Sequence, residues 1–203
     1  MTRPPDEPDE SAESSALAEV VRRAQREGAL ERAEAQRELY ERLVGEAGRF
    51  LLGLRLGLSA GEVEDALQET FVRLFRALPR FDPEREVLPY ALGIARHVAL
   101  DLLAKRPEAA GSEVEGLTAG GRTVGSDAAR EEERDLVNEA LQAIGTEHAA
   151  VLTLRHQNGL TMAQLAEALE CSVPTARKRL RDAARLLRGE LAARGVGREE
   201  EVQ

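Results

Sequence analysis

The sequence predicts an all-α protein built from two small helical domains that are joined by a flexible linker. Apolar residues recur at three- and four-residue steps along most of the 203-residue chain, and no segment alternates as a strand would. Leu and Ala supply most of the apolar content and aromatic residues only 3%, which favours helices because Leu and Ala lose little freedom there. A glycine-rich segment with few large apolar residues separates two helical blocks.

Composition and periodicity together divide the chain into five segments. They are an acidic, partly disordered N-terminal extension (1–35), a first helical domain (36–107), a flexible Gly- and acid-rich linker (108–130), a second helical domain (131–193) and an acidic C-terminal tail (194–203). The first 15 or so residues are rich in proline and acid, so we expect them to be disordered. Residues 16–37 fit a helix with a narrow apolar stripe.

The first domain shows three helical patterns, at 37–58, 59–78 and 90–106. Ser59 with Glu62 three residues later is a capping-box arrangement, so the second of these helices should begin at Ser59. The stretch PRFDPERE, with its two prolines, predicts a structured loop before the third helix.

The second domain ends in a short helix, a turn and a longer helix. Thr161 and Gln164 form a second capping box, which starts a helix over 161–169. Three residues turn the chain, and Ser172 is a good N-cap for a helix that carries Pro174 in its first turn. This succession is the helix-turn-helix arrangement.

The last helix concentrates positive charge in a chain whose formal charge is -9. Six basic residues and one acid, Asp182, lie between Ser172 and Arg188. A solvated helix face is the plain alternative, but such a face normally interleaves acids. In a helix-turn-helix the first residues of the second helix reach base edges, and arginine suits both guanine edges and phosphates. We therefore predict DNA binding.

The remaining composition excludes several classes of protein. The acidity is concentrated in the tails and the linker, so it does not argue against an anionic partner. The sequence shows neither an apolar run of membrane-spanning length nor a secretory signal, and the single cysteine, Cys171, fits a reducing compartment. No catalytic constellation or metal-ligand spacing is evident. We expect a cytoplasmic protein without enzymatic activity, cofactor, metal or membrane insertion.

At this point the residues resemble a known family. DALQETFVRLFRALPRFDPERE followed by YALGIARHVALDLLAKR is similar to the core domain, region 2, of bacterial RNA polymerase sigma factors of the extracytoplasmic-function type in the sigma-70 family. LQAIGTEHAAVLTLRHQNGLTMAQLAEALECSVPTARKRLRDAARLL resembles their C-terminal domain, region 4. The resemblance covers roughly 36–107 and 133–191. It implies a factor that binds core RNA polymerase and directs promoter-specific transcription initiation at −10 and −35 elements.

The resemblance also implies partners and a polymerase-docking surface. In the family, a helix with the pattern D-x-x-Q-E-x-F docks on a coiled coil of the β′ subunit, and the β flap is a further polymerase contact. The docking residues implied here are Asp65, Gln68, Glu69, Arg73 and Arg76. Phe71, within the same pattern, fits the core better. Promoter DNA and a sequestering anti-sigma protein are the other partners that the resemblance implies.

Promoter opening in the family captures non-template bases of the −10 element between a loop and the following helix, which match 81–87 and 88–106 here. Such capture needs stacking surfaces and cations. The implied residues are Phe81, Arg85, Tyr90, Arg96, His97, Lys105 and Arg106. Tyr90 stands where the family usually has Trp, and Val87 where it often has Phe.

Contact with the −35 element falls to the last helix. The residues implied are Ser172, Thr175, Arg177, Lys178, Arg179, Arg181 and Arg185. Arg177, Lys178 and Arg181 are expected to read bases, and the others to contact the backbone. Two departures from the family pattern stand out. Glu170 replaces a glycine in the turn, where a left-handed backbone costs an ordinary residue roughly 1 kcal/mol, and Asp182 replaces a base.

Two alternative functions stay open on the sequence alone. A free-standing transcriptional regulator would use only the helix-turn-helix, which leaves the docking helix unexplained. A protein-interaction adaptor with sigma-like domains would have lost DNA binding.

Overall fold

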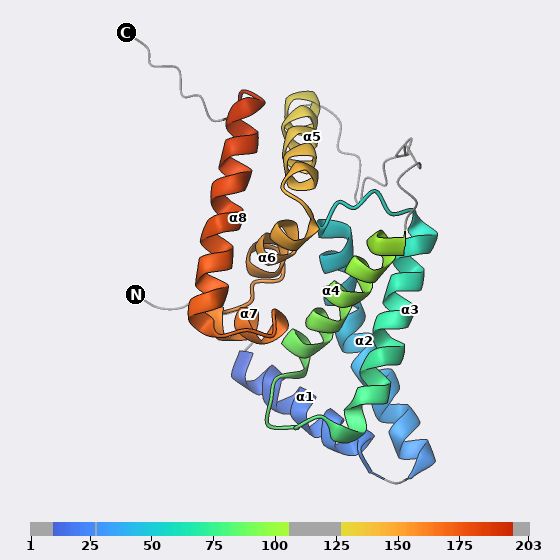
Figure 1. Ribbon diagram of the computed structural model, residues 1–203. Coiled ribbons are helices and arrows are strands. Elements are labelled where there is room, and N and C mark those ends of the chain that lie inside the picture. The colour runs from blue at the N-terminus through green and yellow to red at the C-terminus, as the bar shows by residue number, and fades with distance from the viewer. Residues whose placement is uncertain (1–9, 27, 106–126, 197–203) are drawn as a thin grey trace.

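A computed structural model describes residues 10–26, 28–105 and 127–196, and these ranges contain helices and no strand (Figure 1). The helices are α1 (Glu10–Ala24), α2 (Ala29–Gly53), α3 (Ala60–Ala77), the short 3-10 helix η1 (Leu78–Arg80), α4 (Val87–Lys105), α5 (Asp127–Ala143), α6 (Thr146–His156), α7 (Met162–Ala168) and α8 (Val173–Ala193). The all-α prediction is confirmed. Most of the linker expected at 108–130 lies outside the described residues, and its last residues, from Asp127, already belong to α5.

Local capping signals in the sequence place three helix starts correctly. Ser59 and Glu62 form the capping box of α3, and Thr161 and Gln164 form that of α7. Ser172 caps α8 by accepting a hydrogen bond from the backbone N–H of Thr175. These side chains bond to backbone groups that have no partner within the helix, so the starts follow from local sequence.

The N-terminal domain is the bundle of α1 to α4, with α1 lying across its lower end in Figure 1. Leu17, Val20, Val21 and Ala24 of α1 are buried in one apolar cluster with side chains of α2, α3, η1 and α4. The expected disorder of the first 15 or so residues is therefore wrong from Glu10 onward. A narrow apolar stripe suffices for a helix because the bundle supplies the other half of the contact.

The C-terminal domain consists of α5 to α8, with α8 along one outer edge of the molecule (Figure 1). Ala176 and Ala183 of α8 are buried, while Leu180 and Leu187 are partly buried against the same core. This apolar stripe fixes α8 against the rest of the domain.

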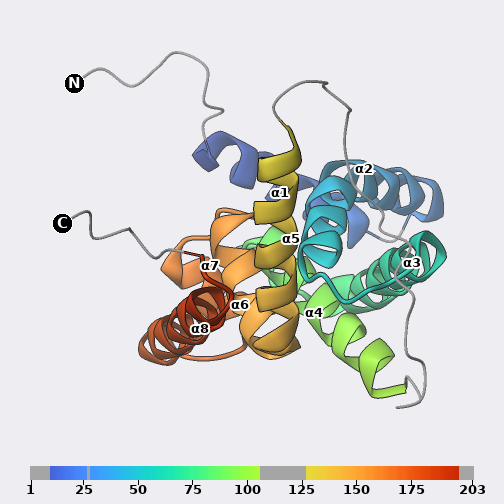
Figure 2. The same ribbon diagram turned by 90° about the horizontal axis from the view of Figure 1, so that it is seen from above.

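The two domains pack directly against each other, with α7 on α4 and α6 on α2 (Figure 2). One buried cluster includes Phe50 and Leu92 from the first domain together with Leu154 and Leu165 from the second. Gly93 permits the approach of α7, because a Cβ placed there would lie 3.0 Å from the backbone oxygen of Ala168. The sequence predicted two domains joined by a flexible linker and gave no sign of a shared core. Only the structure shows that the two domains pack together.

The apolar character of α4 is explained by this position. Among the described residues α4 alone is long and apolar enough to span a membrane, but half of its apolar window is buried inside the fold. Its inner side faces both domains, so its composition is that of a central helix.

Candidate nucleic-acid interface

Helix α8 presents an exposed ridge of cations. The side chains of Arg177, Lys178, Arg181, Arg185 and Arg188 are all exposed. Asp182 is the one acid among them: Lys178 Nζ lies 2.9 Å and Arg185 Nη2 3.7 Å from its carboxylate oxygens. The hydrogen bond from Lys178 is the main cause that lowers the pKa of Asp182, so this acid stays ionised. Within the described ranges Arg177, Arg181 and Arg188 form no hydrogen bond or ion pair, which leaves the ridge open to a polyanion.

The turn before α8 sets the orientation of this ridge. Cys171 N donates to Ala166 O at 2.9 Å, which closes the turn on α7. Glu170 adopts φ 50°, the left-handed conformation expected for the position where the family has glycine. Arg179 donates to the carbonyl oxygen of Leu169 at 3.5 Å, so this arginine partly braces the turn. Ser172 and Thr175 are exposed at the helix start, with their hydroxyl oxygens 2.8 Å apart.

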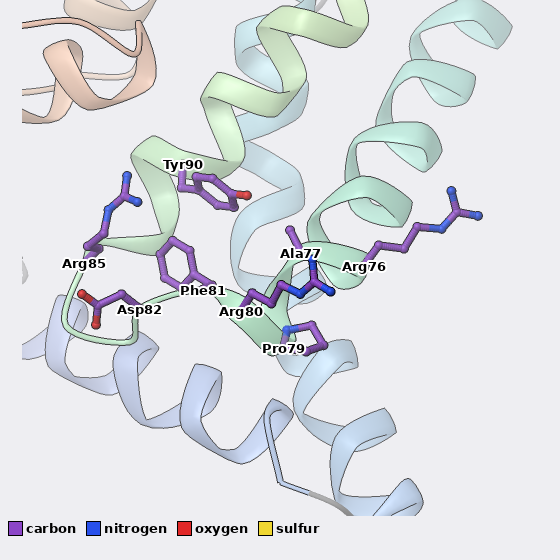
Figure 3. Close-up of a pocket in the computed structure, with 8 residues that line it drawn as sticks. All are labelled: Arg76, Ala77, Pro79, Arg80, Phe81, Asp82, Arg85 and Tyr90. Carbon is purple, nitrogen blue, oxygen red and sulfur yellow. The ribbon is translucent and has the colours of Figure 1, made fainter.

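A second cationic site lies on the loop between η1 and α4 and surrounds an open pocket of about 700 Å³ (Figure 3). The rings of Phe81 and Tyr90 stand 4.8 Å apart, and the guanidinium carbon of Arg85 lies 5.7 Å and 5.8 Å from the two ring centres. Arg76 and Arg80 also line the pocket. The rings are tilted by 37° and Phe81 is buried behind Tyr90, and this aromatic wall with its arginines suits a flat, partly anionic ligand.

Sequence reasoning missed Arg80 as a pocket residue and assigned Arg76 only to polymerase docking. The signal for Arg80 was present, since it is the cation beside Phe81 in the loop. Arg76 is five residues before Phe81, at the end of α3, so its closeness to the loop could also be read from the sequence.

The C-terminal domain contacts three of the side chains expected at the −10 element. Arg85 Nη2 lies 2.8 Å from a carboxylate oxygen of Glu167 on α7. His97 Nε2 is 3.4 Å from Glu170. Arg96 Nη2 donates to both carboxylate oxygens of Glu147, at 3.0 Å and 2.7 Å.

In this docked arrangement the side chain of Arg96 is only 9% exposed, so its guanidinium faces Glu147 and not the surface. Its Nε is buried without a partner in the described part of the chain. Lys105 is exposed at the end of α4, and Arg106 lies outside the described residues.

The docking surface expected on α3 is partly occupied within the chain. Asp65, Gln68 and Arg76 are exposed. Glu69 bonds to Arg73 at 2.7 Å, and Arg73 also donates to Asp101 of α4 at 2.9 Å. These two bonds, led by that with Glu69, raise the pKa of Arg73, whose fork thus ties α3 to α4. Phe71 is buried, as expected, with its ring 4.6 Å from that of Tyr40.

No group of three or more His, Cys, Asp or Glu side chains that could hold a metal occurs among the described residues. The ridge of α8 and the aromatic pocket both present exposed arginines, a chemistry that suits nucleic acid.

Comparisons with known proteins agree with this chemistry. Residues 37–107 match the family described as Sigma-70 region 2. An ECF RNA polymerase sigma-E factor of Salmonella typhimurium is 26% identical over 132 residues, which cover 60% of this chain and 69% of the relative. The ECF RNA polymerase sigma factor SigC of Mycobacterium tuberculosis is 32% identical over 124 residues, which cover 59% of this chain and 65% of that one.

A solved structure, CnrH in complex with the cytosolic domain of CnrY, shares the fold with a TM-score of 0.63 and 23% identity. The match covers 88% of this chain and 98% of that one. The region 2 match includes α3 and the aromatic loop, and the structural match shows that the fold as a whole is shared. Residues 37–107 therefore match the Sigma-70 region 2 family, and the chain as a whole is similar to RNA polymerase sigma factors of the extracytoplasmic-function group.

Proposed function

We propose that this protein binds core RNA polymerase and directs transcription initiation at promoters that it contacts in two places. The observation that carries the proposal is the exposed cationic ridge of α8, which a helix-turn-helix would place in a major groove. Arg177, Lys178 and Arg181 are the proposed readers of the −35 element. Thr175 and Arg185 are proposed to contact phosphates, and Ser172 supports the helix start, where free N–H groups attract phosphate.

The aromatic pocket is the proposed site for a base of the −10 element. A flipped base needs a stacking partner and a cation near its backbone, and the Phe81–Tyr90 pair with Arg85 offers both. Arg80 adds charge at the rim. Tyrosine in place of the usual tryptophan retains a stacking face, with a smaller area.

Polymerase docking is proposed for the exposed side of α3, through Asp65, Gln68 and Arg76. Glu69 and Arg73 support that surface from within, because they are bonded to each other and to α4.

Domain separation is part of the proposal, since the docked C-terminal domain covers part of the −10 face. The carboxylates of Glu167 and Glu147 form ion pairs with Arg85 and Arg96, as phosphate oxygens would. The docked state also leaves Arg96 Nε buried and unpaired, which costs roughly 1–3 kcal/mol. A state with such an unsatisfied group can be displaced by polymerase and DNA, which would offer Arg96 and Arg85 new anionic partners.

Sigma factors in general are not enzymes, and we propose that this chain likewise supplies no chemistry of its own and acts in the bacterial cytoplasm. An anti-sigma protein, which the family resemblance implies, stays part of the proposal. A free-standing regulator is the alternative, but it would have no use for the region 2 match.

The test is run-off transcription with purified core polymerase. We expect promoter-specific transcripts with the wild-type chain and none with polymerase alone. Arg177→Ala should lose discrimination at one −35 position, and Asp65→Ala should weaken polymerase binding on every promoter. DNA binding without transcripts would instead favour the free-standing regulator, and neither activity would favour the adaptor.

A further inference from the structure

The backbone of the aromatic loop is held from outside the loop. Inside it, Asp82 bonds through its side chain to Glu84 N at 3.0 Å and through its carbonyl to Arg85 N at 3.0 Å. These bonds fix the tip. Phe81 N also donates to Leu78 O at 3.1 Å across the η1 turn, whereas the carbonyl of Phe81 accepts no backbone hydrogen bond within the described loop.

Gln25, just after α1, bonds to the carbonyl of Phe81 and adds a second hydrogen bond to that of Leu78. Its Nε2 lies 2.9 Å from Leu78 O and 2.6 Å from Phe81 O, so a single amide group bonds to both ends of the η1 turn. Gln25 is partly buried and lies outside residues 37–107, which match the family model. A carboxamide NH₂ has two donors, and both are used here.

Helix α1 holds this amide in place. Val21 and Ala24, one turn before Gln25 and beside it, are buried in the same cluster as Leu78 and Phe81. A second link, from Arg22 Nη2 to Glu84 Oε1 at 2.6 Å, joins α1 to the loop tip. The loop is therefore clamped to α1 at its start and at its tip.

We propose that Gln25 is a positioning residue for −10 recognition: by fixing the carbonyls of Leu78 and Phe81, it sets the Phe81 ring against Tyr90 and keeps the pocket shaped for one base. The inference rests on the proposed function of that pocket. Gln25 itself touches neither the pocket volume nor the DNA in this scheme.

Gln25→Glu is the sharpest test, because it preserves size while replacing the NH₂ group, which supplies both donors, with a carboxylate oxygen that faces two carbonyl oxygens. Gln142→Glu is the matched control, since it makes the same chemical change on an exposed position of α5. Each variant is combined with core polymerase and assayed for transcription on promoters that differ by single −10 bases over a constant −35 element.

We expect Gln25→Glu to lose roughly tenfold or more of the discrimination at one −10 position, the size of a typical single-base preference. Discrimination among −35 variants should stay at the wild-type level, as it should in Gln142→Glu throughout. The ratio of transcript yields from two promoters does not depend on how much of the variant is folded. A purely structural role for Gln25 would therefore lower the yields from all promoters by the same factor. Unchanged −10 discrimination, or that uniform loss, overturns the inference.

Gln25→Ala removes the donors without adding charge and serves the same measurement if Gln25→Glu does not fold. A wild-type protein that shows no −10 base preference at all would refute the proposed role of the pocket, and with it this inference. If the wild type discriminates among −10 bases and both Gln25→Glu and Gln25→Ala discriminate equally well, only the role of Gln25 is refuted.

Discussion

Substituting Gly93 should separate the two domains. A Cβ at this position would lie 3.0 Å from Ala168 O and 3.5 Å from Ala168 Cα, both backbone atoms of α7. The first of these is tighter than an ordinary contact, so even alanine needs the helices to move by a few tenths of an ångström. Leucine adds three further carbons in a region occupied by backbone, which cannot rotate away.

The expected cost follows from overpacking. Inserting methylenes into a filled interface costs roughly 1–3 kcal/mol. Here the strain disappears when α7 separates from α4. The substitution therefore destabilises the docked state and leaves the free energy of the open state unchanged. The ratio of docked to open molecules should then fall by about 5- to 150-fold. Opening also frees Arg85 and Arg96 from Glu167 and Glu147.

Solution X-ray scattering of the full chain measures the effect, with Gly48→Leu as control because nothing lies within 4 Å of a Cβ at Gly48 in α2. Gly93→Leu should raise the radius of gyration and increase the affinity for core polymerase, while Gly48→Leu should do neither. If both variants scatter like the wild type and bind polymerase equally, the docked arrangement does not limit access to the −10 face, and the reasoning is refuted.

Three further predictions concern α8 and its turn. Glu170→Gly should stabilise the chain by up to roughly 1 kcal/mol, because Glu170 has φ 50°; chemical denaturation measures this, and an unchanged midpoint would remove the strain argument. Asp182→Asn should tighten promoter binding at neutral pH, where the lowered pKa keeps Asp182 negatively charged in the wild type. In the wild type the ion pair between Asp182 and Lys178 should stabilise the fold above the unfolded-state pKa of Asp182, and this stabilisation should be lost as the pH falls through the folded-state pKa. Promoter binding and melting curves measured over a range of pH check both expectations. Arg181→Ala should either reduce the slope of promoter affinity against salt concentration by about one phosphate contact or remove the preference for one base, measured with the holoenzyme. A variant that changes neither shows that Arg181 faces solvent.

The pattern of charge along α8 could be predicted from the sequence because all of its residues lie on one continuous helix. The cap at Ser172, the spacing of Arg177 and Arg181, and the left-handed turn at Glu170 are local properties of a continuous segment. Helical periodicity and capping fix which side chains point outward, and burial of Ala176 and Ala183 on the other side agrees.

Residues that act across elements were harder to predict. Arg96 has the same chemistry as Arg85 in the sequence, yet it is buried against Glu147, which is 51 residues away. Arg73 is tied to Asp101 and Gln25 to the loop for the same reason. A charged or amide side chain within a helix has several partners that it could reach, and only the packing of distant helices selects one.

By itself the amino-acid sequence determined the helices, their caps, the turn before α8 and the row of cations on its outer face, since each depends on interactions within about four residues. Tertiary structure alone decided that α1 is part of the bundle, that α7 lies on α4, and that acids of one domain hold cations of the other. Those outcomes depend on shape complementarity between surfaces far apart in the chain, such as the bare backbone at Gly93 that admits Ala168, and no local pattern encodes which surfaces meet.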